Sequence, residues 1–328
     1  MKLLTIASLL VLLTFSSASA KTDEIRVGMI GLDTSHVVVF TRMFNDSERK
    51  DHVPGARVVA AYKGGSPDIE SSWSRVDGYT ETLQNEFGVK IVDSIEELCE
   101  QVDAVMLESV DGRPHLEQVR PVIAAGLPVF IDKPVAGSLA DAIEIYRLAE
   151  EAGVPVFTAS SFRYYKGVRE LQEMDLGELK GAISYGPAHL EPHHPDLFWY
   201  GIHPAEALFT ILGTGVETVV RTHTPDTDVV TGIWSGGRVG TLRGLRNART
   251  PSRVIAFGTT GVADRPAGAG YFELVTEIEK FFRTGVPPVS AEETLELFAF
   301  MEAADESKRL GGVPVSIAET LEKHSKNE

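Results

Sequence analysis

Cysteine is almost absent from this chain. Cys99 is the only one in 328 residues, so no disulfide bond can form within the chain. It falls in the amphipathic segment SIEELCEQV, where a thiol packs as a small apolar side chain. The fold must therefore be stabilised by burial of apolar surface, and the chain is long enough for two domains with cores of their own.

Positive charge is also scarce. The chain carries 31 lysines and arginines against 47 aspartates and glutamates, which gives a formal net charge of −16. Such a surface repels the phosphates of nucleic acids and the headgroups of anionic lipids. We therefore expect no nucleic-acid partner, and a ligand that is neutral or positively charged.

Long apolar runs are missing after the first twenty residues. That stretch, MKLLTIASLLVLLTFSSASA, has a positive charge at Lys2, an apolar core at residues 3–15 and small residues at 18–20. This order is typical of a Sec-type signal peptide, and the core is short for a bilayer span. We expect cleavage after Ala20, export to the periplasm or the medium, and no membrane contact after the signal is removed.

The first half of the remaining chain alternates predicted strands with predicted helices, which is typical of a parallel sheet with crossover helices. Apolar runs predict strands at 25–30, 57–62, 89–92, 103–108, 128–132 and 155–158. Between them, helices are predicted at 35–45, 78–87, 95–101, 114–125 and 139–152. Ser138 and Asp141 form a capping pattern before the last helix, and Gly153 ends it.

The pattern changes after Ser161. Short alternating segments predict an antiparallel sheet with strands at 179–186, 216–223, 228–235, 238–246 and 252–258. Helices are predicted at 203–212, 270–283 and 291–309, the last capped by Ser290. The expected fold is α/β: a Rossmann-like doubly wound parallel sheet in residues 21–158, followed by an α+β domain with a largely antiparallel open sheet in residues 159–328.

The segment IRVGMIGLDTSHVVVF, residues 25–40, begins as a dinucleotide-binding strand does. Gly31 stands where the fingerprint G-x-G-x-x-G has its first glycine, but Asp33 and His36 stand at the other two. We expect Asp33 to cap the free N–H groups of the following helix, where a phosphate would otherwise bind. A carboxylate there repels a phosphate by roughly 4 kcal/mol at about 4 Å and a dielectric near 20.

Two lysines follow predicted strands at the edge where a doubly wound sheet binds ligands. Lys63 follows the second strand, where it suits a 2′-phosphate, or is a solvated loop lysine. Lys133 lies between the end of a buried strand and Pro134. Desolvation there can fit its amine for proton transfer or for orienting a hydroxyl, although a plain loop lysine remains the alternative.

The densest group of titratable residues lies between 189 and 206. His203 and Glu206 are three residues apart on a predicted helix, so Glu206 could orient the imidazole for acid–base chemistry. A metal site is the weaker alternative, and its ligands would be His193, His194 and Asp196. Because the spacing matches no recognised metal motif, we expect no metal.

Together these segments resemble the Gfo/Idh/MocA family, the glucose–fructose oxidoreductase and inositol dehydrogenase group. VGMIGLDTSH is similar to the family's first strand and glycine loop. VDAVMLESVDGRPHLEQVRPVIAAGLPVFIDKPVAGSLADA is similar to its next strands, including a histidine at a helix start and the Glu-Lys-Pro motif, here Asp132-Lys133-Pro134. SSFRYY, GIHPAEALFTILG and VPPVSAEETLELFAFMEAADESKRLGG are similar to segments of its second domain.

The resemblance implies an oxidoreductase that acts on a sugar or polyol hydroxyl with NAD or NADP. Lys133 and His203 would handle the hydroxyl proton, with Glu206 as the third catalytic residue. Where the family has an aspartate four residues before this histidine, the chain has Trp199, which could stack on a sugar ring. The remaining expected substrate residues are Arg163, Tyr164 and Tyr200. The expected cofactor residues are Gly31, Asp33, Thr34, Ser35, His36, Lys63, Glu108, Ser109, His115, Asp132 and Lys133.

The family also implies a homo-oligomer built on the open sheet. Export of an unfolded chain argues against a cofactor carried from the cytoplasm, so two other functions stay open. One is a lyase or hydrolase that acts on a carbohydrate without a nicotinamide cofactor, using Lys133 and His203, with or without a metal at His193, His194 or Asp196. The other is a carbohydrate-binding protein without catalysis.

Overall fold

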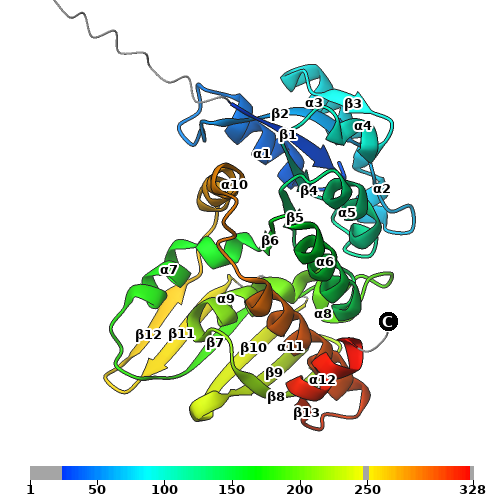
Figure 1. Cartoon of the computed structure of the whole chain (residues 1–328). Coiled ribbons are helices and arrows are strands. Elements are labelled where there is room, and N and C mark those ends of the chain that lie inside the picture. The colour runs from blue at the N-terminus through cyan, green and yellow to red at the C-terminus, as the bar shows by residue number, and fades with distance from the viewer. Residues whose placement is uncertain (1–23, 247–250, 326–328) are drawn as a thin grey trace, which may run out of the picture.

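A computed structural model describes residues 24–246 and 251–325. The expected signal segment lies outside the described residues. The chain builds two sheets, one in each half of the sequence, and Figure 1 shows them one above the other with helices packed between and beside them. No helix among the described residues has the length and apolar character needed to cross a membrane.

The first sheet is parallel and doubly wound, as predicted. Its six strands lie in the order β3-β2-β1-β4-β5-β6. The strand bounds are β1 Ile25–Ile30, β2 Ala56–Tyr62, β3 Lys90–Val92, β4 Ala104–Leu107, β5 Val129–Asp132 and β6 Val156–Ala159. Because the chain order reverses between β1 and β4, the crevice past their carboxyl ends is where this fold binds ligands.

Helices cover both faces of this sheet. They are α1 Ser35–Asn45, α2 Glu70–Trp73, α3 Val76–Phe87, α4 Ile95–Cys99, α5 His115–Ala124 and α6 Leu139–Ala152. The predicted cap of α6 is confirmed, because the Asp141 N–H donates to Ser138 Oγ at 3.1 Å and Gly153 ends the helix in the left-handed conformation. Cys99 is half-buried, and burial raises the pKa of its thiol to about 11, so the sulfur stays protonated.

The second sheet has seven strands in the order β12-β11-β7-β10-β9-β8-β13. All neighbours are antiparallel except β7 and β10, so the prediction of a largely antiparallel sheet is confirmed. The bounds are β7 Leu179–Pro187, β8 Val216–Thr224, β9 Thr227–Trp234, β10 Arg238–Leu245, β11 Arg253–Gly258, β12 Val262–Pro266 and β13 Val315–Ser316. The short edge strands β12 and β13 were not predicted from the sequence.

Helices pack on one face of the second sheet, with α9 against β7 and β10 and α11 against β8. The helices here are α7 Lys166–Glu173, α8 Asp196–Tyr200, α9 Ile202–Leu212, α10 Phe272–Thr284, α11 Ala291–Arg309 and α12 Ile317–Ser325, with the 3-10 turn η1 Ser161–Tyr164 before α7. The buried face of α10 returns to the first domain and packs against α1, as Figure 1 shows. The late segment 272–284 thus completes the core of the first sheet.

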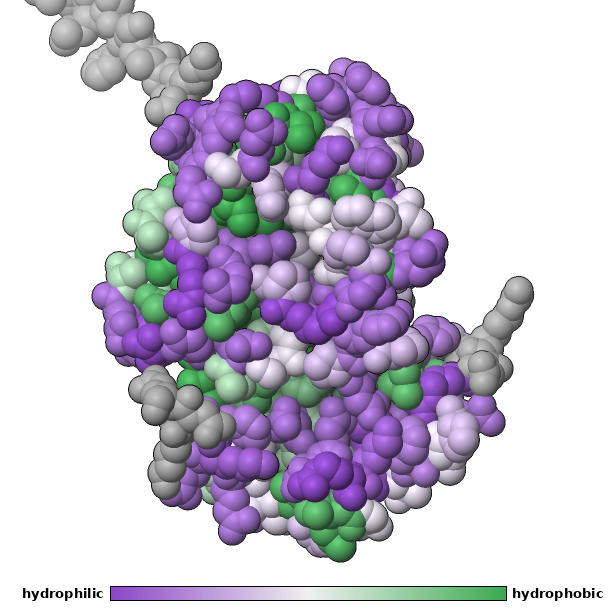
Figure 2. Space-filling view, turned by 90° about the vertical axis from the view of Figure 1, so that its right-hand side faces the viewer, coloured by the Kyte–Doolittle hydropathy of each residue, from purple (hydrophilic) through white to green (hydrophobic). Residues whose placement is uncertain are grey.

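The surface is mostly polar. On the face shown in Figure 2, hydrophilic residues predominate and hydrophobic ones form separate patches. This agrees with the chain's net charge of −16, which keeps a protein soluble but weakens its attraction to anions.

Candidate functional site

The chain leaves β1 through a glycine that no other residue can replace. Gly31 has φ of +86°, and a Cβ at this position would come within 2.5 Å of the Ser109 backbone nitrogen. The loops after β1 and β4 therefore touch backbone to backbone. This close approach forms the floor of the crevice at the carboxyl edge of the sheet.

Asp33 does not cap helix α1, so that prediction is wrong. Its carboxylate is fully buried, accepting from the Val110 N–H at 2.9 Å and from Ser72 Oγ at 2.6 Å. Burial raises the pKa of this carboxyl. The cap is Thr34 instead, whose Oγ1 accepts from the His36 N–H at 3.5 Å. Asp33 holds three loops together, and its hydrogen bonds turn it away from the first turn of the helix.

The residues present fit the pyrophosphate of a dinucleotide. Gly31 and the first turn of the 11-residue helix α1 meet at the end of β1, where backbone N–H groups and the helix dipole favour an anion. Ser35 is exposed in that first turn. Lys63, after β2, is also exposed and pairs with Asp77 at 3.1 Å.

Two of the expected cofactor residues support the crevice from within. His115 is fully buried, and its ring nitrogens lie 2.9 Å from the Ser109 carbonyl oxygen and 3.2 Å from that of Val135. Burial lowers the pKa of this imidazole. Ser109 Oγ donates to Gln118 Oε1 at 2.9 Å. His115 therefore ties the loop after β4 to the loop after β5.

Lys133 emerges from the end of β5 at a cis peptide bond to Pro134. Its side chain is 7% exposed, and Nζ lies 5.6 Å from the centroid of the Tyr200 ring. Among residues 24–246 and 251–325, no carboxylate forms an ion pair with it. A buried ammonium against an aromatic face is held in place and keeps its hydrogen-bond donors for a ligand.

His203 contacts the same tyrosine. Its ring stacks on Phe162 with centroids 4.8 Å apart and meets the edge of Tyr200 at 5.4 Å. Nδ1 is 2.7 Å from Ser160 Oγ. Burial lowers the pKa of His203 well below 6.5, and the charge of Lys133 lowers it further. The imidazole is therefore neutral near pH 7 and able to accept a proton.

Glu206 does not orient His203, so that prediction is wrong too. Its carboxylate accepts from Arg163 Nε at 2.8 Å and from the Ser160 N–H at 3.2 Å. Arg163 also pairs with Glu293 at 2.6 Å, so this expected substrate residue is committed to two carboxylates. Burial raises the pKa of Glu206. The pair Glu206–Arg163 positions Ser160, and Ser160 holds the imidazole.

The expected aromatic substrate residues differ in their access to the crevice. Trp199 is buried against Ile69 and Val110, with its ring 5.0 Å from that of His194. Tyr164 is buried in the core of the first domain, and burial raises the pKa of its hydroxyl. Tyr200 alone among them contacts both Lys133 and His203.

The residues of the weaker metal alternative have separate partners. His193 is exposed and faces Glu191, while Asp196 pairs with Arg221 at 3.0 Å and with Lys308 at 2.6 Å. His194 Nε2 accepts from the Gly112 N–H at 3.3 Å, and Nδ1 lies 3.0 Å from the Pro195 carbonyl oxygen. Nothing draws the three side chains to a common point, so this ligand set is wrong.

The burial of His194 predicts a loss of stability in acid. Burial lowers the pKa of this histidine to about 4, whereas an unfolded histidine titrates near 6.5. As the pH falls below about 6.5, the unfolded state binds this proton and the folded state does not, so stability falls. At pH 5 the loss is about 2 kcal/mol, at 1.36 kcal/mol per pKa unit.

Chemical denaturation of the wild type and of His194→Asn between pH 7.5 and 5 measures this loss. The wild type is expected to lose about 2 kcal/mol more than the variant over that interval. Equal pH dependence of the two proteins would contradict the assignment.

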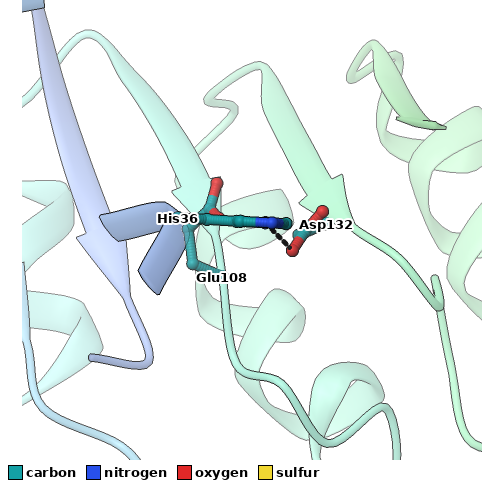
Figure 3. A group of neighbouring side chains, drawn as sticks. All are labelled: His36, Glu108 and Asp132. Carbon is teal, nitrogen blue, oxygen red and sulfur yellow. Dashed lines mark hydrogen bonds and ion pairs between the residues drawn. The ribbon is translucent and has the colours of Figure 1, made fainter. Parts of the chain in front are cut away.

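Three further side chains converge where α1, β4 and β5 meet. His36 Nδ1 lies 2.7 Å from Asp132 Oδ2, and Glu108 completes a group whose potential ligand atoms are all within 4.8 Å of one another. Figure 3 shows the three pointing toward one another from three different elements. The sequence predicted each as a cofactor residue, but not their convergence. The sequence did carry a signal for this convergence, since Glu108 and Asp132 lie at the carboxyl ends of the neighbouring parallel strands β4 and β5.

Fold and site together define a Rossmann domain of the dinucleotide-binding type, which carries Lys133, joined to a largely antiparallel-sheet domain, which carries His203. Residues 25–160 match the model of the oxidoreductase family with an NAD-binding Rossmann fold, GFO_IDH_MocA. Residues 25–160 are thus similar to the Gfo/Idh/MocA family, and the resemblance predicted from the sequence is confirmed.

Curated relatives match about half of the chain. A 1,5-anhydro-D-fructose reductase of Ensifer adhaerens is 32% identical over 178 residues, which cover 52% of this chain and 50% of that protein. Inositol 2-dehydrogenase 3 of Saccharopolyspora erythraea is 28% identical over 183 residues, covering 55% of this chain and 48% of that one. The chain thus spans about half the length of the curated relatives it matches.

Solved structures share the fold over nearly the whole chain. Myo-inositol 2-dehydrogenase from Lactobacillus plantarum aligns with a TM-score of 0.74 at 17% identity, covering 89% of this chain and 99% of that one. Scyllo-inositol dehydrogenase from Lactobacillus casei, solved with NAD(H) and scyllo-inositol, aligns with a TM-score of 0.72 at 14% identity, covering 90% and 99%. At these identities the likeness establishes the two-domain fold.

Proposed function

We propose that this protein is an NAD(P)-dependent oxidoreductase that acts on a hydroxyl group of a sugar or polyol. The observation that carries the proposal is that Lys133 and His203 both contact the Tyr200 ring, at the carboxyl edge of a nucleotide-binding sheet. The relatives support the substrate class, since their names state inositol and anhydrofructose chemistry.

The chain's own residues would bind the hydroxyl and move its proton. The Lys133 ammonium donates a hydrogen bond to the hydroxyl oxygen and stabilises the negative charge that develops there. His203, neutral because burial lowers its pKa, accepts the proton. The face of Tyr200 packs against the C–H groups of the sugar ring. NAD(P), held along Gly31, Ser35 and Lys63, would supply its nicotinamide as the hydride acceptor.

The test is a substrate screen with purified full-length and processed protein. NAD⁺ and NADP⁺ reduction is followed by absorbance with inositols, aldoses and anhydro sugars, and dinucleotide affinity is measured by calorimetry. Reduction of either cofactor by one sugar class supports the proposal. Turnover of a glycoside without nicotinamide would instead identify a lyase or hydrolase, and sugar binding that survives Lys133→Ala without turnover would identify a binding protein.

We further propose that the protein is exported by its N-terminal segment and acts in the periplasm or the medium. The charge at Lys2, the apolar core and the small residues before Lys21 support this location. N-terminal sequencing of the protein recovered from the producing cells is expected to begin at Lys21. A mature chain that still begins at Met1 would contradict cleavage.

We also propose a homo-oligomer formed through the open face of the second sheet. Ile233 on β9 and Val239 on β10 are direct cross-strand partners and are 47% and 45% exposed. They lie on a sheet whose helices pack on the other face, and a second copy would cover them. Ile233→Glu is expected to dissociate the assembly in size-exclusion chromatography with light scattering. Val286→Glu, at a loop valine that is 67% exposed, is the control; a monomeric wild type would contradict the proposal.

A further inference from the structure

The cluster of His36, Glu108 and Asp132 contains more acceptors than donors. Glu108 is 0% exposed and Asp132 is 2% exposed, so both carboxyl groups are buried. The imidazole of His36 has one hydrogen bond, to Asp132 Oδ2, and its ring is otherwise held by Phe40 and Tyr271. The position of the ring is therefore fixed by aromatic contacts as well as by the carboxylate.

Three carboxyl oxygens of this cluster have no hydrogen-bond partner among the residues that the structure describes. They are both oxygens of Glu108 and Oδ1 of Asp132. A buried acceptor without a partner costs about 1–3 kcal/mol, and more when it is charged. Adding a proton to Glu108 does not remove the whole cost, because the second oxygen of that carboxyl group still lacks a donor. The cluster is therefore suited to bind an electron-pair acceptor.

The carboxyl groups of the cluster attract a cation, and Asp33, buried behind the same loops, adds negative charge. The Lys133 ammonium opposes this attraction, because its charge acts on both Glu108 and Asp132. It faces Tyr200, however, and forms no ion pair with these carboxylates within the described part of the chain. Two carboxylates and one imidazole on three separate elements form the donor set that zinc, manganese or ferrous iron prefers.

We propose that His36, Glu108 and Asp132 bind one divalent transition-metal ion. Metal–ligand distances of about 2.0–2.2 Å require ligand atoms about 3–3.6 Å apart. The ligand atoms of the three side chains already lie within 4.8 Å of one another, and the closest pair, His36 Nδ1 and Asp132 Oδ2, is 2.7 Å apart. Small side-chain movements would therefore admit the ion, which would give both oxygens of Glu108 a partner. This goes beyond the proposed function, since neither hydride transfer nor sugar binding by Lys133 and His203 requires it.

The site has a structural consequence that differs from that of a dinucleotide. A metal bound by residues from α1, β4 and β5 fastens three elements of the first domain together and stabilises the folded state by mass action. The stabilisation needs no nicotinamide and no sugar, so it is measured on the protein alone. If no metal-dependent stabilisation is found, the proposal of dehydrogenase activity is unaffected.

The experiment uses chelator-treated, full-length processed protein without cofactor. Mn²⁺ is titrated and followed by electron paramagnetic resonance, bound Zn²⁺ is counted by mass spectrometry after dialysis, and thermal unfolding is recorded with each metal. We expect one ion per chain and a rise in the unfolding temperature. Glu108→Gln and His36→Gln are expected to weaken the affinity by at least about 100-fold, more than loss of a supporting contact does.

His193→Gln is the matched control, since this exposed histidine also pairs with a glutamate, at 3.4 Å, but lies outside the cluster. It is expected to bind the ion as the wild type does. Glu108→Gln keeps the shape of the side chain and replaces one potential ligand oxygen with an amide, and its unfolding temperature without metal shows directly whether it folds. Absence of stoichiometric Mn²⁺ and Zn²⁺ binding, or equal affinity in Glu108→Gln, would overturn the proposal.

Discussion

Replacing Lys133 with methionine is expected to lower kcat/KM for the sugar or polyol by about 10²–10⁴-fold, the range that a positioned proton-transfer or charge-stabilising group contributes. Methionine retains most of the apolar stem that packs under Tyr200 but carries no charge and no donor. The hydroxyl oxygen then loses the ammonium that stabilises its developing negative charge. The dinucleotide affinity is expected to change little, because the groups that fit the pyrophosphate lie at Gly31 and Ser35.

Steady-state kinetics with the best substrate of the screen, together with calorimetric titration of NAD(P)⁺, checks this expectation. Lys166→Met is the matched control, since this lysine on α7 is 87% exposed and lies outside the crevice. It should retain full activity. A Lys133→Met enzyme with kcat/KM within about threefold of the wild type would remove Lys133 from the chemistry and end the proposed mechanism.

The fold could be predicted from the sequence because its signals are local. Apolar runs and capping residues such as Ser138 and Ser290 fixed the strands and long helices, and the observed α1 and α11 begin and end where they were predicted. Strands β12 and β13 were missed because they are short edges whose pairing depends on distant partners. The packing of α10 on the first domain also depends on contacts that no local pattern encodes.

The candidate site was predicted only in part, because side-chain partners are set by tertiary structure. Asp33 fits the pattern of a helix cap, but Ser72 and the Val110 N–H offer it buried donors that the sequence does not bring together. Glu206 shares a helix with His203, yet Arg163 competes for it and its charge is the stronger partner in a buried place. Sequence spacing identifies residues that are neighbours along one helix. It does not show which residue from another element makes the stronger contact.

The largest loss of stability is expected from Asp228→Ala in the second sheet. Asp228 is 0% exposed and lies between two buried arginines, accepting from Arg221 Nε at 2.8 Å and from Arg246 Nη1. Truncation leaves these guanidinium groups desolvated without their central partner. Removing one member of a buried ion network costs about 3–5 kcal/mol.

The same network reaches the candidate site, so the loss has a functional readout. Arg221 also holds Asp196, the first residue of α8, and α8 ends at Tyr200, the ring that contacts both Lys133 and His203. Urea denaturation of Asp228→Ala should give the expected loss of about 3–5 kcal/mol, and any folded fraction should show a raised KM because Tyr200 is no longer held.

Asp264→Ala removes a half-exposed pair with Arg253 on the same sheet, and should cost about 1 kcal/mol or less. Equal costs for the two variants would show that burial of the Asp228 network contributes nothing to holding α8 in place.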